Sequence, residues 1–268
     1  MREVPSKSRG FGARTNVESS GALSGQLHIH AGFGLPMHDF LKLSTSNYNL
    51  NAEAGETEEE FSARMAAEFE ATVLEAGSDT IVAFFAEPMQ SGGGAICPPK
   101  GNWQAMQTVI RKYDIHFHVD ETVCGFGRTG HYWGVEAFDL TPDRTTCAKA
   151  LTAAFFPISA IMFRQDFFDD LMLTSDAPGV LGHGFTYAGH PVGAAVASEA
   201  LKIYGDIDLI GHVRGIGLFC GIQLVQGKGT RALWDPALKV GTMVQDRAHT
   251  RGCTYGPSRP IGLVFCRR

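Results

Sequence analysis

Two acidic residues and one lysine come directly after short apolar runs that have the composition of strands. They are Glu87, Asp120 and Lys149. Ligands of open α/β sheets collect at the carboxyl ends of the strands, so we expect these three side chains to lie at one edge of a sheet. The sequence therefore predicts a site in which two carboxylates and an amine act together.

Lys149 has apolar neighbours, with Cys147-Ala148 before it and Ala150-Leu151 after it. A lysine in apolar surroundings has a lowered pKa, which favours a Schiff base with a carbonyl compound. Aldehyde cofactors use such a lysine together with an acid that keeps the pyridine nitrogen protonated, and Asp120 suits that role. The structural alternatives are a solvated surface lysine and an aspartate that caps the following loop. Both stay open on spacing alone.

The segment 125–130, Gly-Phe-Gly-Arg-Thr-Gly, matches the letters of a dinucleotide-binding fingerprint. That fingerprint belongs in the turn between a strand and the helix that follows it. Here it comes several residues after the strand, and the following His-Tyr-Trp-Gly at 131–134 is a poor helix start. The spacing therefore disfavours a nucleotide site.

A metal site is the other alternative, because His116, His118 and Asp120 alternate and must share one face of a strand. Two histidines and a carboxylate can bind iron or zinc. Three ligands on one straight strand are spread along it and do not converge on one point. We therefore expect no metal site here.

Helix and strand signals alternate along the chain, which predicts an α/β fold with a largely parallel sheet. Thr57 and Glu60 form a capping box at the start of a helix that ends near Gly77. Residues 1–56 contain many turn formers and are expected to be irregular. The other expected elements are helices over 103–113 and 191–204 and strands over 81–85, 115–119, 145–148, 158–163 and 217–225.

The composition is that of an ordinary globular chain of 268 residues, with a net charge of −5 and no long Lys/Arg run. Nucleic acid and anionic membranes are therefore not expected as main partners. No apolar stretch approaches the length of a membrane span and no secretory signal is visible. The six cysteines form no CxxC pair, so we expect free thiols and a cytoplasmic protein.

Several motifs, in order and spacing, resemble the class III (omega) aminotransferases over roughly residues 8–225. They are Ala86-Glu87-Pro88, Gly93-Gly94, Pro98-Pro99-Lys100-Gly101, Asp120-Glu121, the glycine loop 125–130, Thr141-Pro142-Asp143, Ala148-Lys149-Ala150-Leu151 and the segment 183–191. The resemblance implies the type I fold of pyridoxal 5'-phosphate enzymes and a homodimer whose active sites are shared between subunits.

The resemblance also implies roles for individual residues. Lys149 would bind the cofactor aldehyde covalently and later shuttle a proton, and Asp120 would pair with the pyridinium nitrogen. Thr122 stands where the family usually has valine, under the cofactor ring.

Three further residues match cofactor-contacting positions of the family. Thr186 would reach the cofactor phosphate of the neighbouring subunit, and Phe11 falls where an aromatic ring stacks on the other face of the cofactor. Glu87 would support the hydrogen bonds near the ring.

The family's reaction passes an amino group from an amine to the cofactor and then to a keto acid, often pyruvate. Ornithine- and 4-aminobutyrate-type members have a glutamate two residues after the glutamine of the loop, where this chain has Gln90 and then Gly92. This favours an amine-to-pyruvate transaminase. An aminomutase or a decarboxylase of the same fold, and a non-catalytic fragment, are the alternatives.

The resemblance also indicates missing parts. The family's glycine-serine loop, which supplies backbone N–H groups to the cofactor phosphate, would precede residue 1. Arg214 passes directly to Gly215, where the family has a longer segment, and the substrate arginine would fall at Gly256. We therefore expect a partial large domain over 1–204 and a remnant of the small C-terminal domain over 205–268.

Overall fold

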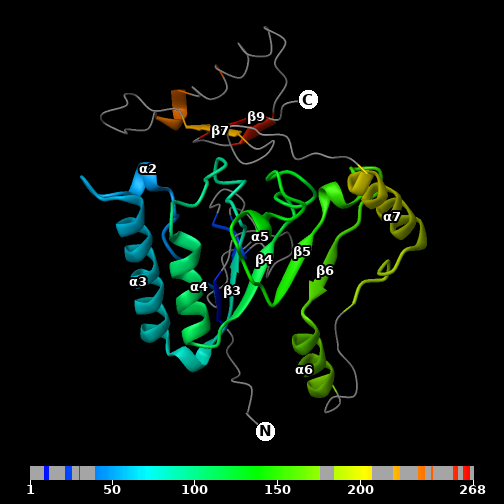
Figure 1. Ribbon diagram of the computed structural model, residues 1–268, viewed down its shortest axis with the longest axis horizontal. Helices are drawn as coiled ribbons and strands as arrows, with labels where there is room; N and C mark the ends of the chain where they lie inside the picture. Colours follow the sequence, from blue (N-terminus) through cyan, green and yellow to red (C-terminus); the bar gives the residue numbers. More distant parts are fainter. Residues whose placement is uncertain are drawn as a thin grey trace.

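A six-stranded sheet forms the centre of the molecule (Figure 1). The computed structural model describes residues 9–11, 22–25, 30, 40–175, 184–206, 220–223, 235–238, 243, 256–258 and 262–265. The strand order is β2-β1-β3-β4-β5-β6, and every pairing is parallel except that of β6 with β5. Its strands are β1 (Arg9–Phe11), β2 (Phe40–Leu41), β3 (Ile81–Ala86), β4 (His116–Asp120), β5 (Arg144–Cys147) and β6 (Ala160–Phe163).

Two long helices, α3 (Glu58–Ala76) and α4 (Asn102–Lys112), lie side by side and cover one face of this sheet (Figure 1). A second, antiparallel sheet has the order β7-β9-β8. The remaining elements are α2 (Tyr48–Asn51), η2 (Ser78–Thr80), α5 (Gly134–Ala137), η3 (Lys149–Thr152), α6 (Gln165–Ser175), α7 (Pro191–Asp206), β7 (Cys220–Gln223), η4 (Pro236–Leu238), β8 (Gly256–Ser258) and β9 (Gly262–Phe265).

The start of α3 is fixed by the capping box that the sequence predicts. The Glu60 backbone N–H donates to Thr57 Oγ1 at 3.2 Å, and the Thr57 backbone N–H donates to Glu60 Oε2 at 2.8 Å. Two N–H groups that the first helical turn cannot pair internally are thereby satisfied. The buried stripe of the helix is the expected one, Phe61, Met65, Phe69 and Val73.

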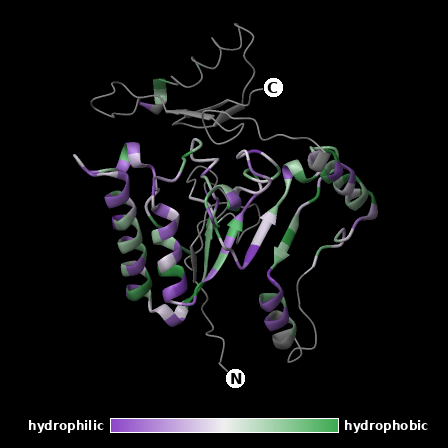
Figure 2. Ribbon diagram, viewed as in Figure 1, coloured by the Kyte–Doolittle hydropathy of each residue, from purple (hydrophilic) through white to green (hydrophobic). Residues whose placement is uncertain are grey.

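The main core fills the space between these two helices and the central strands. Phe84 of β3 contacts Phe69 of α3 and Phe117 of β4, with ring centroids 4.9 and 5.9 Å apart. Trp103 of α4 completes the cluster and donates from its indole nitrogen to the Pro88 carbonyl at 2.9 Å. In Figure 2 most of β3 is green, as expected for a strand of a parallel sheet that is covered by helices, whereas β5, with the sequence Arg-Thr-Thr-Cys, is white and purple.

Most of the expected elements are confirmed, two expectations differ from the structure, and α2, α5, α6, β8 and β9 were not expected. Residues 1–56 are not irregular throughout, because β1, β2 and α2 lie within them. The three residues of β1 show no apolar alternation, and they are extended because they pair with β2 and β3 on either side. The strand expected over 158–163 begins at Ala160 and is antiparallel.

The two sheets use different parts of the chain: residues 9–163 contain the first, and 220–265 contain the second. We propose on this ground that the division near residue 204 separates two domains. No helix in the described ranges combines the length and apolar character that crossing a membrane requires.

Candidate functional site

Three polar residues lie level with one another at the carboxyl edge of the main sheet. Ala86 of β3 pairs with Val119 of β4, and Glu87 and Asp120 are the residues that follow this last pair. The register of β4 and β5 pairs Asp120 with Thr146. Lys149 follows three residues after Thr146, at the start of η3. Adjacent strands lie about 4.8 Å apart, so this edge gathers two carboxylates, a hydroxyl and an amine.

Asp120 is buried, with 7% of its surface exposed, and only one of its two oxygens is engaged. Oδ1 accepts from the Thr122 backbone N–H at 2.9 Å and from the Thr146 hydroxyl at 3.3 Å. Oδ2 accepts no hydrogen bond from any residue in the described part of the chain. A carboxylate held through one oxygen can present the other to a donor on a ligand.

Lys149 lies at an unusual backbone conformation, with φ of 47°. A residue other than glycine in this left-handed region costs on the order of 1 kcal/mol or more, and such strain is concentrated at functional sites. The side chain is exposed, so the expectation of an enclosed amine is wrong for the single chain. Its neighbours in sequence differ from it: Cys147 and Leu151 are buried, whereas Phe155 is 84% exposed, because apolar residue types in sequence do not show which of them are covered.

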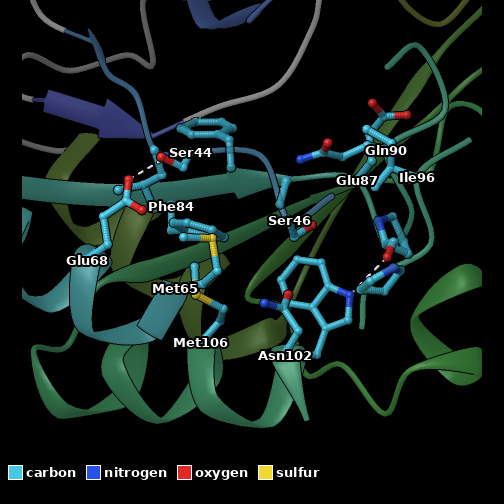
Figure 3. Close-up of a pocket in the computed structure, with 16 residues that line it drawn as sticks. Ser44, Ser46, Met65, Glu68, Phe84, Glu87, Gln90, Ile96, Asn102 and Met106 are labelled. Carbon is cyan, nitrogen blue, oxygen red and sulfur yellow. Dashed lines mark hydrogen bonds between the residues drawn. The ribbon is translucent and has the colours of Figure 1, made fainter. Parts of the chain in front are cut away.

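Glu87 is buried and bound within its own loop, where Oε2 accepts from the Ser91 backbone N–H at 3.1 Å and from the Ser91 hydroxyl. It also lines a cavity of about 110 Å³, shown in Figure 3, whose apolar wall includes Phe84 and Trp103. Neither Asp120 nor Lys149 lines this cavity. Glu87 therefore follows β3 at the same edge of the sheet as Asp120 and Lys149. Its side chain, however, lines a cavity that those two residues do not line.

The structure does not bring Phe11 to the level of Asp120. Phe11 pairs with Phe84, which pairs with Phe117, and Phe117 lies three residues before Asp120 on β4. Three residues of a strand span about 10 Å. The stacking role expected for Phe11 is therefore not supported by the strand register, and its side chain lies outside the described part of the chain.

Thr122 and Thr186 lie in different surroundings. Thr122 is half-buried directly beyond Asp120, and its backbone N–H holds that carboxylate. Thr186 is fully on the surface, in a turn just before α7. An exposed hydroxyl there is compatible with a contact to a second subunit.

The residue that sequence reasoning missed is Glu121, which is fully buried. Its Oε1 accepts from the Val135 backbone N–H at 2.7 Å, while Oε2 is buried without a partner among the described residues. Gly134 is required beside it, since a Cβ there would lie 2.8 Å from Oε2. Burial raises the pKa of Glu121 to about 7, only partly offset by the Val135 N–H. Its place directly after Asp120 was the available sequence signal.

Glu121 should make the free energy of unfolding decrease as pH rises. Its pKa in the folded chain, about 7, lies above the ordinary value of 4.5, so only the unfolded chain loses the proton between these values. Its contribution to stability is complete below pH 4.5 and is lost as pH rises through about 7. Between about pH 5 and about pH 8, wild type should lose roughly 1–3 kcal/mol more unfolding free energy than Glu121→Gln.

Urea unfolding at both pH values measures this difference. Glu75→Gln, which neutralises an exposed carboxylate on α3, is the control and should keep the wild-type pH dependence. Equal losses in wild type and Glu121→Gln would contradict the assignment.

The glycine loop 125–130 does not open a helix, because turns and bends continue to Trp133 and α5 begins at Gly134. Gly127 has a φ of 87°, and its N–H donates to the Tyr132 carbonyl at 3.2 Å. The loop thus closes on itself with the geometry of tight turns. This agrees with the sequence-based argument against a dinucleotide site.

The two histidines of β4 have separate contacts. The His116 ring is exposed and meets the Phe167 ring edge-on at 4.9 Å, whereas His118 is buried with Nε2 3.1 Å from Thr146 Oγ1. Within the described ranges, no group of three or more His, Cys, Asp or Glu side chains is arranged to hold a metal ion.

Comparison with known proteins identifies relatives along most of this chain. An uncharacterized aminotransferase of Sinorhizobium fredii is 35% identical over 94% of the chain and 58% of its own length. Gamma aminobutyrate transaminase 2 of Solanum lycopersicum is 37% identical over 86% of the chain and 55% of its own length. The chain thus spans little more than half the length of these curated relatives.

Solved structures agree with the sequence relatives. The omega transaminase of Pseudomonas jessenii in complex with PMP superposes with a TM-score of 0.90 and 34% identity, covering 97% of this chain and 63% of that one. The fold is therefore the type I transaminase fold. A family model described as aminotransferase class-III matches residues 8–210, which include the edge with Glu87, Asp120 and Lys149. The chain belongs to the class-III aminotransferase family.

Proposed function

We propose that this chain carries the cofactor-binding centre of a pyridoxal 5'-phosphate-dependent transaminase. The enzyme would move an amino group from an amine or an omega-amino acid to a keto acid such as pyruvate. The observation that carries the proposal is the geometry of Asp120, a buried carboxylate with one oxygen held and one available, beside the strand that leads to Lys149.

The residues present fit this cofactor. A pyridine ring nitrogen is best held in its protonated form by a buried carboxylate acceptor, and Oδ2 of Asp120 is such an acceptor. A cofactor aldehyde needs a primary amine within reach, and Lys149 is the lysine just past the neighbouring strand. Pyridoxal phosphate supplies the electron sink that stabilises a carbanion next to nitrogen.

Each residue of the edge then has a defined task. Lys149 Nζ would hold the cofactor through its aldehyde carbon, with loss of the aldehyde oxygen as water, and would later accept and return a proton. Asp120 Oδ2 would accept from the ring nitrogen, and Thr122 would contact the ring. Glu87 supports the hydrogen bonds near it, and Thr186 contacts the phosphate held by a second subunit. Phe11 remains the proposed stacking residue by its place in the family motif alone, since the strand register sets it three residues before the level of Asp120.

A second copy of the chain is the proposed partner. The surface near Lys149 and before α7 exposes large apolar side chains, among them Phe155, Phe185 and Tyr187. Such a group of apolar side chains on one surface is typical of a protein interface. Covering it would also enclose the exposed side chain of Lys149. We place the enzyme in the cytoplasm, which agrees with the unpaired thiols of Cys124 and Cys147.

Cofactor titration of the purified chain tests the proposal. Added pyridoxal phosphate should produce a visible absorption band, and borohydride should then fix the cofactor to Lys149. Incubation with an amine and pyruvate should yield alanine, and omission of pyruvate should stop turnover. Product formed from the amine alone beyond one equivalent per site would instead indicate an aminomutase or a decarboxylase. No cofactor binding by folded protein would reject the proposal.

A further inference from the structure

Three polar side chains form a continuous hydrogen-bonded chain between β4 and β5. His118 Nε2 lies 3.1 Å from Thr146 Oγ1, and the Thr146 hydroxyl donates to Asp120 Oδ1 at 3.3 Å. The register pairs Asp120 with Thr146 and His118 with Arg144, so all three members of the chain project from the same face of the sheet.

The direction of each hydrogen bond follows from the groups involved. An ionised carboxylate only accepts, so the single hydrogen of the Thr146 hydroxyl points to Asp120. The hydroxyl oxygen must then accept from His118, which places the imidazole hydrogen on Nε2. Burial lowers the pKa of His118 to about 3, which keeps the ring neutral with that single N–H. Nδ1, which carries no hydrogen in this tautomer, is buried and has no partner among the described residues.

Packing holds the imidazole at this orientation. The His118 ring stacks on Phe85 of β3, with centroids 4.7 Å apart and planes inclined by 29°. The guanidinium of Arg144 lies 5.2 Å from the centroid of the same Phe85 ring. A ring fixed on one face by an aromatic neighbour and at one edge by a hydrogen bond has little freedom to turn its donor away.

We propose that His118 and Thr146 are positioning residues that fix the carboxylate of Asp120, with Oδ1 held inside the sheet and Oδ2 directed to the ring nitrogen of the cofactor. This inference rests on the proposed function. The Thr122 N–H alone fixes Oδ1 from one direction, and the Thr146 hydroxyl adds the second direction that sets the plane of the carboxylate. A carboxylate held in this plane keeps Oδ2 aimed at the ring nitrogen, and that acceptor favours the protonated ring.

The hydrogen-bonded chain from His118 through Thr146 to Asp120 is called the relay below. Thr146→Val tests it because this substitution removes the hydroxyl and keeps the shape of the side chain. Thr145→Val is the matched control: Thr145 is the preceding residue of β5, is buried where Thr146 is half-buried, and projects from the opposite face. Two measurements apply, the dissociation constant of pyridoxal phosphate and the ¹⁵N signal of its ring nitrogen in the complex. Thr146→Val should weaken binding about tenfold and move the signal toward the unprotonated form. Thr145→Val and the conservative Thr146→Ser should match wild type.

His118→Leu should act in the same direction with a smaller effect, about threefold on binding, because Thr146 can still donate. Thermal unfolding of every variant separates loss of the fold from loss of the relay, since a purely structural role would not move the ring-nitrogen signal. If wild type binds the cofactor through Lys149 while Thr146→Val keeps both wild-type values, the relay is overturned and the function stands. If folded wild type fails to bind the cofactor, the proposed function itself is rejected.

Discussion

Lys149→Ala should abolish covalent attachment of the cofactor. After incubation with pyridoxal phosphate and reduction with borohydride, wild type should gain the mass of one cofactor at residue 149, and the variant should gain none. The amine at Nζ has no replacement among the residues at this edge, because Asp120, Thr146 and Glu87 supply only oxygen atoms. Loss of the proton-transfer group should also lower the rate of amino-group transfer by about 10⁴-fold.

Two further variants separate the amine from general effects of charge. Lys149→Arg keeps a positive charge but removes the nucleophile, so it should behave like the alanine variant. Lys202→Ala removes an exposed lysine of α7 that pairs with Glu199, and it should retain full labelling at residue 149. A cofactor adduct of unchanged amount in Lys149→Ala, mapped to another lysine, would assign the role elsewhere.

The sequence predicts the part of the site that depends on strand ends. Apolar runs that end in Glu87, Asp120 and the segment before Lys149 correctly predicted parallel strands whose carboxyl ends meet at one edge. Short buried strands and a capped helix have local signals, namely apolar period and capping residues, that need no knowledge of distant partners. Their order then leaves few possible topologies.

The parts that could not be predicted depend on contacts between distant segments. Strand β1 has no strand-like pattern of its own and is extended only because β2 and β3 flank it. The exposure of Lys149 depends on what covers η3, which local composition does not encode. The link from His118 through Thr146 to Asp120 depends on the register of β4 with β5, which brings together Asp120 and Thr146, 26 residues apart in sequence. The sequence therefore identified His118 only as a candidate metal ligand.

Asp120→Asn should separate cofactor binding from cofactor chemistry. The asparagine Oδ1 can still accept from the Thr122 N–H and the Thr146 hydroxyl, so the side chain should keep its orientation. That orientation places Nδ2, a donor, where the carboxylate presented an acceptor. Because Nδ2 and a protonated ring nitrogen would both be donors, the ring nitrogen should lose its proton. Attachment to Lys149 does not depend on that proton, so borohydride should still fix the cofactor to Lys149. We expect about tenfold weaker binding and about 10³-fold slower amino-group transfer.

Asp114→Asn is the control for this substitution. Asp114 precedes the other end of β4, is exposed, and has a φ of 52°, a conformation that asparagine tolerates well. It should retain wild-type binding and rate. The ¹⁵N signal of the ring nitrogen distinguishes the two possible causes of a slow Asp120→Asn variant. An unprotonated signal with an intact bond to Lys149 supports the assignment. A protonated signal would mean that another acid faces the ring, because no neutral amide can hold that proton, and Asp120 would then be only the cap of its loop.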